Sequence, residues 1–107
     1  MSFASFDMNS NIKNSYLHII NLEFKEANKF LDIERRCNSQ NGFIPLYDNY
    51  IDFFKIIINE DIIYFKSHEK FKANRIQLIN KNDKSSPYFL YSKSEITLQW
   101  ALARLKF

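Results

Sequence analysis

Apolar residues recur every three or four positions along most of the chain, and short polar stretches interrupt this pattern at four places. The spacing is that of amphipathic α-helices, each with one face turned toward a core. It predicts an all-α fold of about five helices that pair as antiparallel hairpins. We expect a single domain over residues 1–107, with helices at residues 8–20, 24–38, 45–59, 61–80 and 87–106.

The first hairpin depends on a change of helical register at residues 21–23. The expected inward faces before and after this point are Met8, Ile12, Tyr16, Ile19 and Ile20, then Phe24, Ala27, Phe30, Leu31 and Glu34. A tight turn between two helices explains the change. One uninterrupted helix through Asn21 is the alternative, because no glycine or proline stands there. Asp7 or Ser10 is expected to cap the first helix.

The turn before the third helix contains the only glycine of the chain, Gly42. We expect Asn41 or Gly42 to end the preceding helix in a left-handed conformation, and Pro45 to lie in the first turn of the next. That next helix has the most regular apolar face: Tyr47, Tyr50, Ile51, Phe54, Ile57 and Ile58. Residues 59–61 interrupt the pattern, and the following long helix is expected to turn inward Phe65, Phe71, Ile76 and Ile79.

The last helix follows a polar loop at residues 80–86 and begins with a strong signal, Ser86 as N-cap and Pro87 as first residue. Its expected buried face is Leu90, Tyr91, Leu98, Ala101, Leu102 and Leu105. Trp100 adds a second apolar side, so we expect this helix to contact a neighbour. The neighbour would be a partner, including a second copy of the chain, or a further segment of a longer parent protein.

Composition supports a folded domain and leaves its compartment open. The 107 residues are 46% hydrophobic and 25% charged, and one glycine with two prolines is too little turn chemistry for a sandwich of many short strands. Charged residues interrupt the apolar region 50–65, so we expect a soluble chain without membrane insertion.

The single cysteine, Cys37, cannot form an intramolecular disulfide in a cytoplasmic or an exported chain. An intact signal peptide is not predicted, although Ser2-Phe3-Ala4 resembles the end of one in an exported parent protein.

Residues 21–27, NLEFKEA, with Leu31 after them, resemble the turn and second helix of a tetratricopeptide repeat. Residues 83–91 and 98–107 resemble the N-terminal helical region of larger bacterial proteins that carry such repeats. The resemblance implies a right-handed α-solenoid of stacked helix pairs, and a scaffold that binds a protein or peptide without chemistry of its own. Because the hairpins differ in length, we expect an irregular stack.

The residues that most often carry chemistry are scattered. His18 and His68 have no metal-ligand spacing, and Cys37 has no histidine or acid at the spacing of a catalytic nucleophile. The carboxylates are dispersed among lysines, as on solvated helix faces. We therefore expect no catalytic residues, no metal site and no cofactor.

Two sets of residues are candidates for binding. Aromatic anchors are common at protein interfaces, and the candidates for partner binding are Tyr47, Tyr50, Tyr88, Tyr91 and Trp100. The alternative interpretation places these rings in the core, with hydroxyls at its rim. The second set is a basic face at residues 66–84, formed by Lys66, Lys70, Lys72 and Arg75, which would contact an anionic ligand or nucleic acid. A net charge of only +3 makes nucleic acid the lesser expectation.

Overall fold

The computed structural model describes residues 5–107, and within this range the chain forms six helices and no strand. The helices are α1 (Ser10–Ile20), α2 (Phe24–Cys37), α3 (Phe43–Asn59), α4 (Ile62–His68), α5 (Phe71–Asn80) and α6 (Pro87–Lys106). The all-α prediction is thereby confirmed. The signal-like segment Ser2-Phe3-Ala4 lies outside the described residues. No helix in the described range is long and apolar enough to cross a membrane.

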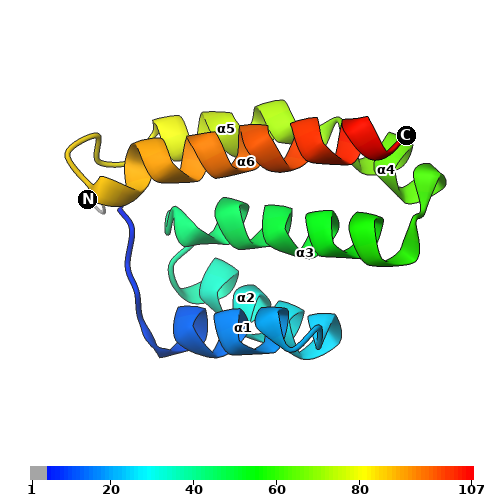
Figure 1. Ribbon diagram of the computed structural model, residues 1–107. Helices are drawn as coiled ribbons and strands as arrows, with labels where there is room; N and C mark the ends of the chain where they lie inside the picture. Colours follow the sequence, from blue (N-terminus) through cyan, green and yellow to red (C-terminus); the bar gives the residue numbers. More distant parts are fainter. Residues whose placement is uncertain (1–4) are drawn as a thin grey trace.

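Helix α3 is the centre of the molecule. It lies between the α1–α2 hairpin on one side and the α5–α6 pair on the other, while the short α4 turns the chain near the end of α6 (Figure 1). Because helices cover α3 from two sides, its buried side chains point in several directions, and they include Phe43, Leu46, Ile51 and Ile56. The segment before α1 crosses the start of α3, where the Gly42 N–H donates to the Ser5 carbonyl oxygen.

The α1–α2 hairpin is present, and the alternative of one uninterrupted helix is wrong. Leu22 has a φ of 61°, a left-handed conformation that reverses the chain, and the Glu23 N–H donates to the His18 carbonyl oxygen at 2.8 Å. The cap of α1 is Asn9 rather than Asp7 or Ser10, because the Asn9 side chain accepts from the Ile12 N–H. Ile12 and Ile19 of the predicted face are buried, and so are Ala27 and Leu31 of α2, whereas Met8, Tyr16 and Ile20 are exposed.

The long helix predicted at residues 61–80 is two helices, α4 and α5, separated by a turn at Glu69 and Lys70. Side chains compete with the backbone at the end of α4, where the Ser67 hydroxyl donates to the Tyr64 carbonyl oxygen at 3.0 Å. The break also separates Phe65, which is buried, from Phe71, which is largely exposed rather than inward. Phe65 and Phe71 are six positions apart and so lie on different sides of a helix, and one helix could bury both only if neighbours covered it on two sides, as they do α3.

The glycine before α3 is required by space rather than by backbone conformation. Gly42 has a φ of −64°, and Leu22 and Glu60 are the described residues with left-handed φ, so the predicted left-handed Gly42 or Asn41 is wrong. A Cβ atom at Gly42 would lie 2.6 Å from the Phe6 ring and 2.9 Å from Asn82 Oδ1. The N-terminal segment can therefore pack on the start of α3 only because residue 42 has no side chain.

Helix α6 packs with the face opposite to the predicted one. Its buried residues are Phe89, Ser92, Ile96, Gln99, Trp100 and Ala103, whereas the predicted inward residues Leu90, Tyr91, Leu98, Ala101, Leu102 and Leu105 are exposed. The indole N–H of Trp100 donates to Asn49 Oδ1 at 2.7 Å. A buried donor of this kind needs an acceptor, and in the observed rotation of α6 Asn49 supplies one while the leucines face outward.

Candidate binding groove

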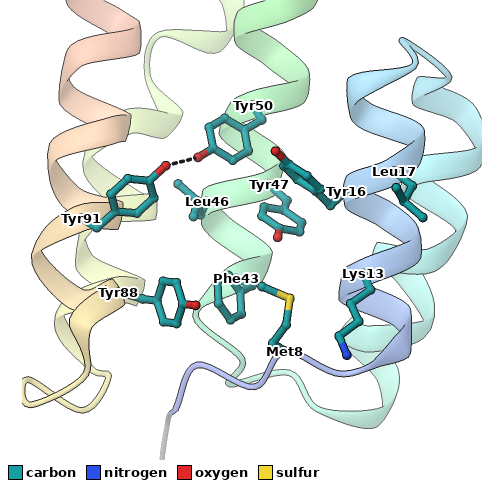
Figure 2. A pocket seen from close by; sticks show the side chains of 10 residues that line it. All are labelled: Met8, Lys13, Tyr16, Leu17, Phe43, Leu46, Tyr47, Tyr50, Tyr88 and Tyr91. Atoms are coloured by element: carbon teal, nitrogen blue, oxygen red, sulfur yellow. Dashed lines mark hydrogen bonds between the residues drawn. The ribbon is translucent and has the colours of Figure 1, made fainter.

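A groove lies between α1 and α6, with α3 as its floor (Figure 2), and it encloses about 430 Å³. Its lining comes from the three helices and the segment before α1, and consists of Met8, Lys13, Tyr16, Leu17, Phe43, Leu46, Tyr47, Tyr50, Tyr88 and Tyr91. Half of these residues are tyrosines, and we call the site the tyrosine groove. The volume is within the range of natural ligand sites, about 300–1,000 Å³.

The floor of the tyrosine groove is apolar and closely packed. Phe43, Leu46 and Tyr47 are each at most 4% exposed. Aromatic rings follow one another across it from α6 to α1: the ring centroids are 4.9 Å apart for Tyr88 and Phe43, 5.7 Å for Phe43 and Tyr47, and 5.9 Å for Tyr47 and Tyr16. Such rings have few rotatable bonds, so the floor is organised before any ligand arrives.

The walls of the tyrosine groove expose both apolar and hydrogen-bonding groups. Tyr16, Leu17, Tyr88 and Tyr91 each leave between 39% and 52% of their surface accessible. The hydroxyls of Tyr50 and Tyr91 share a hydrogen bond of 3.1 Å that joins α3 to α6 (Figure 2). Burial, and then this bond, raise the pKa of Tyr50, so its hydroxyl stays neutral at physiological pH.

One charged side chain lines the tyrosine groove. Lys13 projects from α1 at the edge of the groove (Figure 2). None of the ion pairs within residues 5–107 includes Lys13. An apolar surface with a single uncompensated cation is complementary to a ligand that is apolar and carries one negative charge.

The depression on the opposite side of α3, between α2 and α5, has a different character. Its lining combines apolar and polar side chains with three charged groups, of which Arg35 pairs with Asp48 and Arg75 pairs with Asp52 beside the depression. Burial raises the pKa of Asp48, although the Arg35 guanidinium opposes the shift. Because its charges already form ion pairs within the chain, this depression is less complementary to a charged ligand than the tyrosine groove is.

Four of the five aromatic residues predicted for partner binding meet in the tyrosine groove. Tyr47, Tyr50, Tyr88 and Tyr91 line it, while Trp100 is 2% exposed and belongs to the core. Met8 and Tyr16 were both predicted to face the core, and Lys13 and Leu17 were not predicted to bind a partner. The spacing gave a signal for Leu17, which is five positions after Ile12 and falls off its face, but none for Tyr16, whose four-residue spacing from Ile12 predicts burial.

Arg75, one of the four residues of the predicted basic face, is mostly buried. The Arg75 side chain is 12% exposed, and its Nη2 lies 2.7 Å from Asp52 Oδ2. Arg75 also donates to Asn49 Oδ1, and the Tyr64 hydroxyl donates to Asp52. Arg75 is therefore part of a buried polar network, not of an outer surface. Lys66, Lys70 and Lys72 remain, but the turn between α4 and α5 divides them between separate elements.

Two of the carboxylates, Glu34 and Asp52, are buried rather than solvated. Glu34 is 1% exposed and accepts hydrogen bonds from the side-chain amides of four asparagines, which are Asn9, Asn11, Asn38 and Asn41. Burial raises the pKa of Glu34, but the four donors outweigh it, and the net pKa is lowered. The cluster ties the segment before α1 to the end of α2, so its chemistry is structural.

The remaining reactive residues are not assembled into a centre. His18 stacks on Phe30, His68 stacks on Tyr64, and Cys37 is exposed at the end of α2. In the part of the chain that the structure describes, no three histidine, cysteine, aspartate or glutamate residues are grouped so as to hold a metal ion. No protein-family model, curated protein or solved structure matches the chain.

Proposed function

We propose that the protein is a non-catalytic binding module that holds a segment of another protein in the tyrosine groove. The observation that carries this proposal is the convergence of five tyrosines from three helices around an apolar, preorganised floor. Tyrosine and methionine are enriched at protein interfaces, and lysine is depleted there. The resemblance of residues 21–31 to a tetratricopeptide repeat supports the same class of function, because that family binds proteins and peptides through α-hairpin surfaces.

The chemistry of the groove describes the segment that it would bind. The floor suits one large apolar side chain, whose burial contributes about 1.5–3 kcal/mol. The neutral hydroxyls at the rim suit the backbone amides of a peptide. Lys13 suits a carboxylate beside the apolar anchor, although one exposed ion pair adds only about 0.2–1 kcal/mol. The expected ligand is a peptide with an aromatic or leucine anchor and an adjacent acidic residue, and its affinity is expected to be on the order of micromolar.

The test is a selection from a peptide display library on the immobilised protein, followed by calorimetric titration of the enriched peptides. Leu17→Ala and Tyr88→Ala are expected to weaken binding by about tenfold each, which is about 1.4 kcal/mol. Leu105→Ala is the matched control, because Leu105 is an exposed leucine that does not line the groove. Enriched peptides that bind the groove variants as tightly as the native protein would refute the proposal, as would a selection without enrichment.

A further inference from the structure

The outward face of α6 is an apolar surface that the chain itself does not cover. Leu98, Leu102 and Leu105 are 52%, 43% and 84% exposed, and Ala101 is exposed between them. At 100° per residue these positions occupy the arc opposite to the buried face of α6. We call them the leucine face. A soluble chain seldom exposes contiguous leucines unless the surface has a partner.

We propose that the leucine face pairs with the leucine face of a second copy, with the two α6 helices antiparallel about a two-fold axis. The charged residues beside the leucine face favour the antiparallel arrangement. Glu95 and Lys106 are about three helical turns apart and so lie along the same edge of it. In an antiparallel two-fold pair the same edges meet. An axis midway between residues 100 and 101 therefore sets Glu95 opposite Lys106 of the partner subunit, and the reverse contact follows by symmetry.

The leucines meet in this same register. With a rise of about 1.5 Å per residue, Leu98 lies within about 2 Å along the axis of Leu102 of the partner subunit. Leu105 then lies about 3 Å along the axis from Leu98 of the partner subunit. The leucines thus lie close together in the register that the charges select, which is the behaviour of a self-complementary surface.

The size of the contact sets its strength. Within residues 94–107, the two helices bury less than the roughly 800 Å² per partner of a standard interface. We expect a reversible dimer with a Kd on the order of 100 µM. Tyr88 and Tyr91 precede the overlap, so both tyrosine grooves stay open in the dimer. A ligand with two binding segments would then gain avidity.

Sedimentation equilibrium of the full chain from about 10 µM to about 1 mM tests the proposal. The native protein is expected to show a monomer–dimer equilibrium. Leu98→Asp is expected to abolish it, and Ile63→Asp, at an exposed isoleucine of α4, to leave it unchanged. A monomer at every concentration would overturn the proposal, and so would a dimer that persists in Leu98→Asp.

A charge exchange tests the register. Glu95→Lys alone and Lys106→Glu alone are each expected to weaken the dimer by about fivefold, because each removes two symmetry-related ion pairs. The combined variant is expected to restore it. Lys106 also contacts Glu60 of its own chain at 2.8 Å, so Glu60→Gln is the control and is expected to leave the dimer intact. Failure of the combined variant to restore association would overturn the antiparallel register, and thermal melts monitored by circular dichroism verify that each variant folds.

Discussion

Replacing Asn49 by alanine is expected to cost about 3 kcal/mol of folding free energy, because this one side chain joins three helices. Asn49 on α3 accepts from Trp100 at 2.7 Å and from Arg75 at 3.1 Å, and it donates to Gln99 at 2.7 Å. The variant leaves all three partners without this contact in a buried environment. Each neutral bond contributes about 1 kcal/mol, and the bond from Arg75 somewhat more. The higher helix propensity of alanine returns about 0.5 kcal/mol.

Urea unfolding measures this cost. Trp100 is the only tryptophan, so its fluorescence reports directly on the affected site, and far-ultraviolet circular dichroism reports on the helices. With a slope of about 1.5 kcal/mol/M, the midpoint is expected to fall by about 2 M. Asn74→Ala is the matched control, since Asn74 is exposed on α5, and it should change stability by less than about 0.5 kcal/mol. A loss below about 1 kcal/mol for Asn49→Ala would refute the reasoning that this residue fixes α3 against α6.

Two further predictions concern the segment before α1. Because the pKa of Glu34 is lowered in the folded protein, its contribution to stability is fully present above the pKa of the unfolded chain and is lost as the pH falls through the folded-state pKa. The melting temperature of the native protein is expected to decline in acid, and that of Glu34→Gln to decline much less. Equal declines would contradict this prediction. Gly42→Ala is expected to destabilise the fold by about 1–3 kcal/mol, because the new methyl group would overlap the Phe6 ring. A raised melting temperature would instead show that the Phe6 ring can move away from residue 42 without loss of stability.

Local signals were sufficient for most of the fold. The register change at residues 21–23, the turn formers around Gly42, and the Ser86-Pro87 pair each depend on residues next to one another, and each marks a true boundary between helices. The division of residues 61–80 was missed, since no glycine or proline marks the turn at Glu69 and Lys70. The Ser67 hydroxyl and the His68 ring instead contact the Tyr64 carbonyl oxygen near this turn, and the spacing of apolar residues does not predict such contacts.

The candidate site shows the same division between local and distant information. The sequence shows that tyrosines are present, and this residue type is common at interfaces. That they line one groove depends on the positions of α1 and α6, which are distant in sequence and lie on either side of the same part of α3. Trp100 was selected with them and lies elsewhere, because its N–H is satisfied by Asn49 inside the core. Arg75 was predicted on a solvated face, whereas Glu34 was predicted on an inward face and was also counted among the dispersed carboxylates. Long-range partners bury both.

The amino-acid sequence by itself determined that the chain is helical, where most helices begin and end, and that α6 is apolar on more than one side. Those properties depend on contacts within a few residues, which a linear pattern records. Tertiary structure alone decided which side of α6 is buried and which tyrosines form a groove. Burial of apolar area does not specify which side of α6 faces inward, and the buried side is the one on which the Trp100 indole and the Gln99 side chain both hydrogen-bond to Asn49 on another helix.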